Sequence, residues 1–310
     1  MKKKKKIILG IATGLVAIII AGLTILPFIV INPMVNRHCD FSHVWAAEDF
    51  GLTAYHFFAE TEDGLKISSY EVPVDNPKAV IICLSGIHGP SVTAYFGHAR
   101  LFTAHGYATV LLDMRAHGES EGNRICLGYK EYLDVKAVLQ YLKSNPAYEG
   151  VPIVVMGVSM GGATAINSIG ELPEIDGLIS LSAYSSWEEV FYENMKTQAP
   201  AFLALISKPF ISLSSFLKYG SESCTVKPIK EIKKLGHRPA LLMHSLDDSQ
   251  VPYANFERLL SQAPERVETF VREGDKHFIT ESFIEPEQDN EYAEVLINFL
   301  NKHFCPRITQ

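Results

Sequence analysis

VMGVSMGG, residues 155–162, is the stretch that decides the fold of this chain. It contains the pentapeptide G-x-S-x-G at residues 157–161, directly after the apolar run 152–156. Between a strand and a helix, such a pentapeptide can hold a serine hydroxyl on a sharp turn, because the flanking glycines let the turn close. Glycine and serine also occur together in ordinary bends. Ser159 is therefore a candidate nucleophile only if the rest of the chain supplies a base, an acid and an oxyanion site.

Around this stretch, short apolar runs alternate with longer segments of helical periodicity. Several of the runs are almost entirely apolar, as expected for strands that are buried on both faces. The alternation predicts an α/β fold with a mostly parallel central sheet and helices on both faces. The predicted strands are residues 56–60, 67–73, 79–84, 108–113, 153–157, 178–182, 240–244 and 269–272, and the predicted helices between them are 94–105, 130–144, 161–171, 252–261 and 288–303.

One long interval interrupts the alternation, because residues 183–238 contain no convincing strand. Two apolar, helix-like segments, 187–197 and 201–219, lie inside it. A connection of this length without structure of its own would be unusual in a compact domain, so we predict a helical cap at about residues 184–237. Such a cap could form an apolar acyl or leaving-group pocket. The candidate substrate-binding residues in it are Phe202, Leu205, Phe210 and Phe216.

Residues that can carry chemistry come directly after the predicted strands. In open parallel sheets, sites form outside the carboxyl ends of the strands. Ser159 follows one predicted strand, the acidic pair Asp247 and Asp248 follows a later one, and His277 follows the last. A serine hydroxyl becomes a good nucleophile when a base takes its proton. The chain order of serine, acid and histidine is the order of the α/β-hydrolase triad.

The sequence resembles the α/β-hydrolase family, in particular its bacterial serine-hydrolase branch with esterase-like and peptidase-like members. The resemblance covers roughly residues 55–305. It rests on the segments GVSMGG (157–162), DMRAHGES (113–120), HSLDDSQVP (244–252) and GDKHF (274–278). The fold that it implies is the α/β-hydrolase fold with a helical cap insertion.

This resemblance also implies a role for each member of the triad. Ser159 is expected to be the nucleophile, and His277 the base that takes its proton and later protonates the leaving group. The family's acid stands four residues after the histidine that matches His244, which selects Asp248, with Asp247 as the alternative. This acid holds the imidazole tautomer and stabilises the imidazolium.

The tetrahedral oxyanion of acyl transfer needs preorganised N–H donors. The backbone amide of Met160, at the start of the helix after the nucleophile, is the first predicted donor. The second is expected in the loop after the strand at 79–84, where Ser85-Gly86 replaces the family's usual His-Gly. We therefore predict the amide of Ile87 as the second donor, although His88 could be mistaken for the family histidine. We interpret the nearby DMRAHGES segment as a hydrogen-bonded turn that shapes the wall of the site.

The first forty residues differ from the rest of the chain. Five lysines at 2–6 precede 25 uncharged residues, 7–31, which is long enough to span a membrane. A cleaved signal peptide is the alternative, but its apolar region would be about 7–15 residues long and followed by an A-x-A-like site. We predict a single-pass membrane protein with an uncleaved transmembrane anchor at 7–31 and a cytoplasmic segment at 1–6. A linker at 32–54 and an extracytoplasmic hydrolase domain at 55–310 would follow.

Composition excludes other classes of function. The chain has 28 basic and 35 acidic residues, so without the five lysines 23 basic residues face 35 acidic ones, a balance of −12. A body this acidic has no electrostatic footprint for nucleic acid. The five cysteines show no C-x-x-C spacing, and no histidine or acidic cluster has the spacing of metal ligands.

These observations predict a membrane-anchored serine hydrolase, most similar to carboxylesterases. It would cleave a small-molecule carboxylic ester through an acyl-serine intermediate, with no metal and no organic cofactor. A serine peptidase or an acyltransferase with the same triad remains an alternative, because all three use the same acyl-serine. A non-catalytic, membrane-tethered binding protein of the same fold is the alternative outside enzymes.

Overall fold

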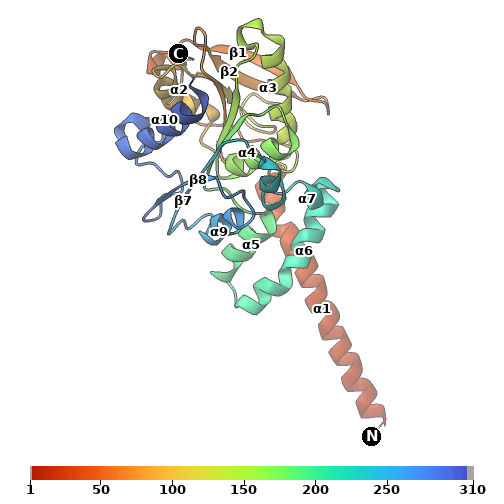
Figure 1. Cartoon of the computed structure of the whole chain (residues 1–310). Coiled ribbons are helices and arrows are strands. Elements are labelled where there is room, and N and C mark those ends of the chain that lie inside the picture. The colour runs from red at the N-terminus through yellow and green to blue at the C-terminus, as the bar shows by residue number, and fades with distance from the viewer. Residues whose placement is uncertain (1, 306–310) are drawn as a thin grey trace.

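A computed structural model describes residues 2–305, and its centre is an eight-stranded sheet (Figure 1). The strand order is β1-β2-β4-β3-β5-β6-β7-β8. Strand β2 pairs antiparallel with β1 and β4, and all the other pairs are parallel. The strands are β1 (Tyr55–Glu60), β2 (Lys66–Val72), β3 (Val80–Leu84), β4 (Ala108–Leu112), β5 (Ile153–Val158), β6 (Gly177–Leu181), β7 (Ala240–Ser245) and β8 (Glu268–Arg272).

All eight predicted strands are present, with ends that differ by one residue from the prediction. Strands β3, β4, β5 and β6 are buried along their whole length. Helices cover both of their faces, so every position needs an apolar or well-bonded side chain and the runs do not alternate. The edge strand β8 alternates between half-buried and exposed positions instead.

Two layers of helices sandwich the sheet (Figure 1). The helices α3 (Tyr132–Ser144), α4 (Met160–Glu171) and α9 (Ala254–Leu260) contribute to one apolar core, while α2 (Phe96–Thr103) and α10 (Asn290–Phe304) contribute to the other. This is the predicted arrangement of an α/β-hydrolase fold. The shorter helical turns are η1 (Ala47–Phe50), η2 (Val92–Tyr95), η3 (Pro146–Tyr148), α7 (Glu222–Thr225), α8 (Pro228–Glu231), η4 (Ile232–Leu235) and η5 (Pro286–Gln288).

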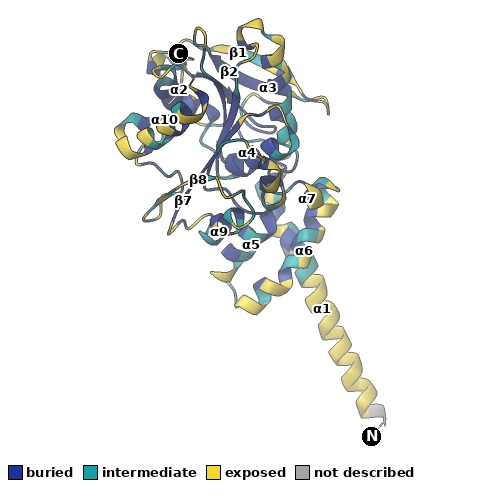
Figure 2. Cartoon of the chain, in the orientation of Figure 1, coloured by how far each residue is buried: buried dark blue, intermediate teal, exposed yellow. Residues whose placement is uncertain are grey.

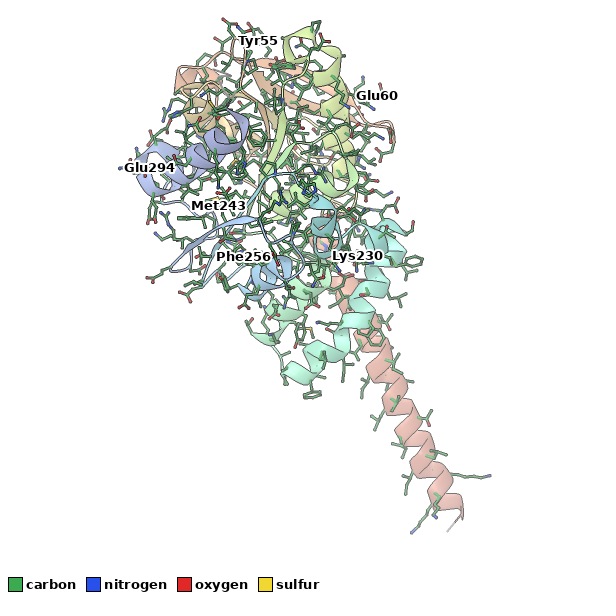
Figure 3. The ribbon with its side chains drawn as sticks, in the orientation of Figure 1. Tyr55, Glu60, Lys230, Met243, Phe256 and Glu294 are labelled. Atoms are coloured by element: carbon green, nitrogen blue, oxygen red, sulfur yellow. The ribbon has the colours of Figure 1, made fainter. Side chains whose placement is uncertain are left out.

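The N-terminal helix α1 (Lys2–Val35) projects away from the domain (Figure 1). Residues 4–22 are all exposed, and their side chains stand clear of the rest of the chain (Figures 2 and 3). Near its end, by contrast, Pro27, Ile31 and Val35 are buried against the domain. The helix therefore continues past the predicted boundary at residue 31, and its last turns are part of the folded body.

The segment predicted as a linker, residues 32–54, also packs on the domain. The backbone N–H of Cys39 donates to the carbonyl of Ala116 over 2.8 Å, and Ala47 and Phe50 are buried in the core around α2. This differs from the prediction because an irregular segment has no periodicity that would reveal its burial. Met1 and residues 306–310 of the predicted segments lie outside the described residues.

The insertion between β6 and β7 is helical, as predicted for the cap. It contains α5 (Trp187–Lys196) and α6 (Ala201–Tyr219), which lie on the side of the domain from which α1 leaves (Figure 1). Ion pairs fix α5 to its surroundings: Lys208 Nζ lies 2.8 Å from Glu189, and Lys227 Nζ lies 2.6 Å from the buried Glu188. The cap is therefore a packed part of the structure beside the carboxyl ends of the strands.

Candidate active site

The turn between β5 and α4 holds Ser159 in a strained conformation. Its φ is 58° and its ψ is −120°, a region that serine rarely adopts. Its backbone N–H donates to the carbonyl of Leu181 over 2.8 Å, which ties the turn to the end of β6. A Cβ at Gly157 would collide with the backbone of Gly161, and a Cβ at Gly161 would collide with carbonyl oxygens at the end of β3. Both glycines are therefore required for this turn to close.

Asp248 and His277 form a buried pair on the loops after β7 and β8. The His277 Nδ1 lies 2.8 Å from Oδ2 of Asp248, and both side chains are buried. The other oxygen of Asp248 accepts hydrogen bonds from the backbone amides of Gln250 and Val251, each over 2.9 Å. Burial by itself would raise the pKa of the Asp248 carboxyl, but the hydrogen bond from His277 and the amide of Val251 outweigh it and lower the pKa. Asp248 is therefore held as a carboxylate against the imidazole.

Asp247, the alternative acid of the sequence prediction, is exposed. Its backbone N–H donates to the carbonyl of Gly274 over 3.2 Å, whereas the contact with His277 comes from Asp248. The placement favours Asp248 as the partner of the histidine. The other nearby histidine, His244, is engaged elsewhere, since its Nε2 lies 2.8 Å from the carbonyl oxygen of Val251.

Ser159 and His277 line two adjoining pockets that share Gln250. Ser159, Met160 and Val251 line the larger, apolar pocket, and His277 lines the smaller, polar one. Within the described residues no hydrogen bond joins the serine hydroxyl to the imidazole. Catalytic hydrogen bonds are commonly loose before substrate binds. The loop from Asp248 to Val251 is thus the element that connects the histidine to the serine side of the site.

The loop after β3 lies against the nucleophile turn. A Cβ at Gly86 would stand 3.7 Å from the Cβ of Ser159, and Ile87 lines the same pocket as Ser159 and Met160. Within residues 2–305 neither the amide of Ile87 nor that of Met160 donates a hydrogen bond to another group. Two unengaged amides beside the serine are what an oxyanion would need. His88 instead points to the N-terminal helix, with Nε2 2.8 Å from the carbonyl oxygen of Met34.

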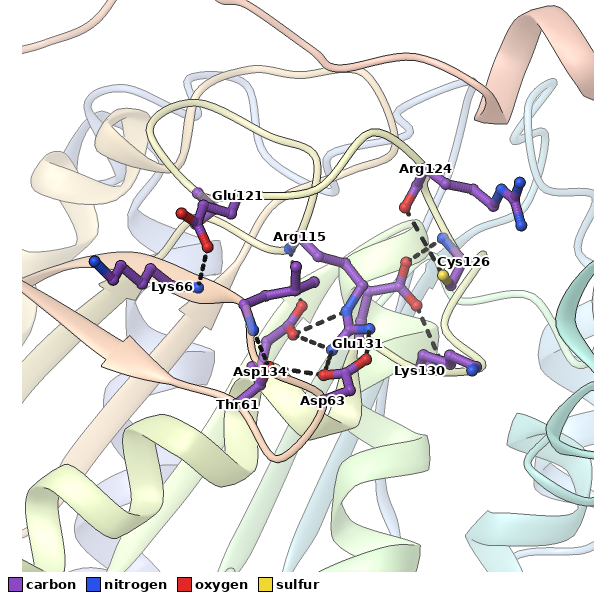
Figure 4. A network of polar contacts seen from close by, with 12 residues as sticks. Thr61, Asp63, Lys66, Arg115, Glu121, Arg124, Cys126, Lys130, Glu131 and Asp134 are labelled. Atoms are coloured by element: carbon purple, nitrogen blue, oxygen red, sulfur yellow. Dashed lines mark hydrogen bonds and ion pairs between the residues drawn. The ribbon is translucent and has the colours of Figure 1, made fainter.

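The turn of the DMRAHGES segment supports this loop from behind. Nε2 of the buried His117 lies 2.7 Å from the carbonyl oxygen of Ile87, and its Nδ1 lies 2.9 Å from the carbonyl oxygen of Arg115. The guanidinium of Arg115 is itself fixed by Asp134 over 2.7 Å and by Asp63 over 2.7 Å (Figure 4). This chain of contacts agrees with the interpretation of the turn as a structural wall. It also places His117 as a positioning residue for Ile87, which the sequence pattern did not reveal.

The pocket beside Ser159 has a volume of about 510 Å³, within the range of small-molecule sites. Its walls come from the end of α1, from α5 and the residues that follow it, and from the loops after β3, β5, β6 and β7. Among its described lining residues none is Asp, Glu, Lys or Arg. They are Val30, Met34, Ile87, Ser159, Met160, Tyr184, Trp187, Val190, Phe191, Asn194, Met195, Gln198, Ala199, Gln250 and Val251.

The cap contributes to this pocket through α5, and not through the predicted residues of α6. Phe202, Leu205 and Phe216 are exposed, Phe210 is half-buried, and none of these four lines the pocket. The residues that sequence reasoning missed are Val30 and Met34 of α1 and the apolar face of α5. No local pattern in α1 indicates that Val30 and Met34 line a pocket, because the apolar part of the helix has the composition of a membrane span. Their role depends on how α1 packs on the domain. Trp187, Val190, Phe191 and Asn194 do recur at helical spacing, which could have identified a face of α5.

Within the described residues, no group of three or more His, Cys, Asp or Glu side chains is placed to hold a metal ion. Ser159 shares its pocket with Met160 and Ile87, and the pair of Asp248 and His277 lies at the adjoining pocket. A serine, an imidazole held by a carboxylate and backbone amides that face the same pocket are the groups that acyl transfer through a serine requires.

Comparison with known proteins identifies hydrolases as similar to this chain. Residues 75–225 match the family model of a serine aminopeptidase, S33. The Bacillus subtilis protein YqkD is 26% identical over 290 residues, which is 88% of this chain and 91% of that protein. Human monoglyceride lipase is 33% identical over 115 residues, which is 36% of this chain and 37% of that enzyme. Among solved structures, the Pyrococcus furiosus esterase Pf2001 is similar with a TM-score of 0.67 and 25% identity, covering 87% of this chain and 100% of the esterase. Together with the sheet topology and the nucleophile turn, these similarities support an α/β-hydrolase family and a hydrolase activity for this chain.

Proposed function

We propose that this protein is a serine hydrolase that cleaves carboxylic esters through an acyl-serine intermediate. Ser159 attacks the ester carbonyl, His277 takes its proton and returns it to the leaving alcohol, and Asp248 orients the imidazole. The amides of Met160 and Ile87 stabilise the oxyanion. The observation that carries this proposal is the buried contact of 2.8 Å between Asp248 and His277, because the loop that carries Asp248 continues into Gln250 and Val251, which line the pocket of the strained Ser159.

The lining of the pocket favours an ester substrate over a peptide with a free amino terminus, which is the substrate of an aminopeptidase. An aminopeptidase must hold the ammonium group of its substrate, which requires a carboxylate or several carbonyl acceptors. No carboxylate is among the described residues that line the pocket, and most of its wall is apolar or aromatic. Similarity to a monoglyceride lipase and to an esterase supports the same choice.

We also propose that α1 anchors the enzyme in a membrane, with the lysines on the cytoplasmic side and the hydrolase domain on the other side. Residues 4–35 form a helix with a mean hydropathy of 2.8 in its most apolar window. A signal peptide would be cut between its apolar region and the mature domain. Here that region enters the domain with Ile31 and Val35 buried, so cleavage would remove part of the core.

Fluorophosphonate labelling of the full-length protein tests the catalytic proposal. The wild type is expected to be labelled at Ser159 and to hydrolyse p-nitrophenyl esters, and Ser159→Ala to do neither. Failure of the folded wild type to react would favour a binding protein of the same fold, and labelling that survives Ser159→Ala would mean that another serine is the nucleophile. Parallel assays with peptide amides and with acceptor alcohols distinguish hydrolase, peptidase and acyltransferase.

Thiol accessibility tests the orientation in the membrane. Cys224 and Cys305 are exposed, whereas Cys39, Cys83 and Cys126 are buried. In right-side-out membrane vesicles, a membrane-impermeant maleimide is expected to label Cys224 and Cys305 without detergent. Labelling only after the vesicles are opened would place the domain on the cytoplasmic side, and recovery of the protein from the soluble fraction would contradict the anchor.

A further inference from the structure

Helix α6 has the reverse of the polarity of a surface helix in a water-soluble protein. Every one of its exposed residues is apolar, and these are Ala201, Phe202, Leu205, Ile206, Pro209, Leu213, Phe216 and Leu217. Most of its buried residues carry a hydroxyl, and the buried set is Ala204, Ser207, Ile211, Ser214, Ser215 and Tyr219. A helix in contact with water normally directs its apolar stripe inward. The outer face of α6 therefore fits an apolar surrounding rather than water.

The position of α6 indicates what this surrounding is. Helix α6 packs against α1, and Lys218 Nζ near its end donates to Oδ1 of Asn36 over 2.9 Å. Residues 7–26, which precede the turns of α1 that enter the domain, would be about 30 Å long as a helix, the thickness of a hydrocarbon core. The membrane boundary therefore falls where α1 reaches the domain, beside α6 (Figure 1). This continuity favours a lipid leaflet over a second protein as the partner of the exposed face.

The same junction reaches the candidate catalytic pocket. Val30 lines the pocket and is 39% exposed, and Met34 lines the pocket one turn later. The carbonyl of Met34 lies 2.8 Å from Nε2 of His88, next to the predicted oxyanion donor Ile87. The end of α1 is thus at once the end of the candidate span and a wall of the pocket.

We propose that the outer face of α6 lies in the membrane leaflet from which α1 emerges, so that the pocket takes the acyl chain of a lipid ester directly from this leaflet. The choice of substrate rests on the proposed esterase activity, whereas the contact between α6 and the lipid rests only on the proposed membrane anchor. Val30 and Met34 border the path of the acyl chain, and the ester carbonyl stops at Ser159. Because the substrate is already concentrated in the bilayer, it can enter the pocket without first crossing water.

A fluorescence measurement tests the contact independently of catalysis. In full-length protein with Cys224→Ser and Cys305→Ser, an environment-sensitive NBD group is attached at Leu217→Cys on α6 or, as a matched control, at Tyr55→Cys. Leu217 is 64% exposed and Tyr55 is 59% exposed, and Tyr55 lies at the opposite end of the domain (Figure 3). Reconstitution into phosphatidylcholine vesicles is expected to shift the emission to the blue only at position 217, with quenching by doxyl-labelled lipids. Water-like emission at both positions would overturn the proposal. So would a blue shift at 217 that doxyl lipids do not quench, since this would mean a protein partner.

A kinetic measurement tests delivery from the leaflet. The double variant Leu213→Asn, Leu217→Asn is compared with Tyr55→Asn, Phe58→Asn, which changes exposed side chains of β1. The α6 variant is expected to hydrolyse a long-chain monoacyl ester in vesicles about tenfold more slowly, because membrane binding scales with buried apolar area, and to keep its rate on soluble p-nitrophenyl acetate. Equal long-chain rates in the two variants would overturn the proposal. If the wild type hydrolyses neither ester and is not labelled by fluorophosphonate, the proposed function is refuted. The fluorescence test of the contact between α6 and lipid is not affected by this result.

Discussion

The two walls of the site are held in different ways. The sheet wall consists of the loops after β3, β5, β7 and β8, and the helical wall consists of α5 and the last turns of α1, with α6 packed against both of these helices. In the sheet wall, Asp248 and His277 are buried, and the turn at Ser159 is locked by backbone groups. Beside the helical wall, most buried residues of α6 carry a hydroxyl group and all of its exposed residues are apolar. Figure 2 shows the alternation of buried and exposed positions along this helix.

This difference shows where each wall obtains its apolar environment. The sheet wall has helices on both sides, so the protein itself supplies the low dielectric in which a carboxylate and an imidazole interact strongly. The outer face of α6, by our proposal, obtains its apolar environment from a lipid leaflet. Substitutions in the sheet wall should therefore be harmful under all conditions, whereas substitutions on the outer face of α6 should be harmful only when lipid is present.

The largest expected effect comes from the acid of the sheet wall. Asp248→Asn is expected to lower kcat on soluble esters by about 10⁴-fold, since an amide cannot hold the required tautomer of His277. Asp247→Asn, the matched control with an exposed side chain, should change kcat little. Steady-state kinetics on p-nitrophenyl esters measure both. A comparable loss in the two variants would remove the distinction between the adjacent carboxylates.

A second prediction compares two neighbouring positions of α6. Ile211 is fully buried, and Ile211→Ala is expected to reduce the free energy of unfolding by about 2–5 kcal/mol. Leu213 is 43% exposed, and Leu213→Ala should cost only about 0.5 kcal/mol without lipid. Denaturation of both variants in mild detergent measures the two values. Equal losses would mean that the outer face of α6 is packed against protein.

Two helical glycines provide a further contrast. Gly161→Ala in α4 should destabilise by about 1–3 kcal/mol, because the new Cβ meets backbone carbonyls at the end of β3 that cannot move aside. Gly14→Ala in α1 has no atom within 4 Å of the new Cβ, so it should be neutral or slightly stabilising. Thermal unfolding of the two variants checks this. A tolerated Gly161→Ala would contradict the close packing of the nucleophile turn.

The last prediction concerns the pH dependence of stability at Asp113, which directly follows β4. Burial raises the pKa of its carboxyl to about 7, and hydrogen bonds from backbone amides only partly offset this. The folded protein therefore keeps a proton that the unfolded chain releases near pH 4, so this group's contribution to stability falls as pH rises from about 4 to about 7. The Tm of Asp113→Asn minus that of the wild type should increase between pH 5 and pH 8. A flat or falling difference would mean that the carboxyl is already ionised in the fold.

Much of the fold and of the candidate triad could be predicted from the chain alone. Strands buried on both faces have continuous apolar runs, and the positions just after these runs are where a parallel sheet gathers its reactive side chains. Ser159, His277 and the acidic pair of Asp247 and Asp248 were placed in this way, and the resemblance to the α/β-hydrolase family selected Asp248. The strained φ of Ser159 and the contact between Asp248 and His277 agree with these places. The oxyanion donors Met160 and Ile87 remain predictions that only kinetics can test.

The rest depended on contacts between segments that are distant in sequence. The apolar residues of α6 were predicted to line the pocket. Composition cannot tell the inner face of a helix from its outer face when hydroxyl-bearing residues occupy the inner face. The role of His117 behind Ile87, and the burial of Cys39 and Phe50 in a supposed linker, likewise have no local pattern.

The sequence by itself determined the alternating α/β order, the nucleophile turn, the chain order of the triad and an N-terminal apolar helix, because periodicity, glycine requirements and span length are local properties. Only the tertiary structure decided which carboxylate meets the histidine, and that the last turns of α1 form a wall of the pocket. The physical reason is the same in both cases. Desolvation and packing depend on which surfaces meet in space, and the sequence records that information only through the whole fold.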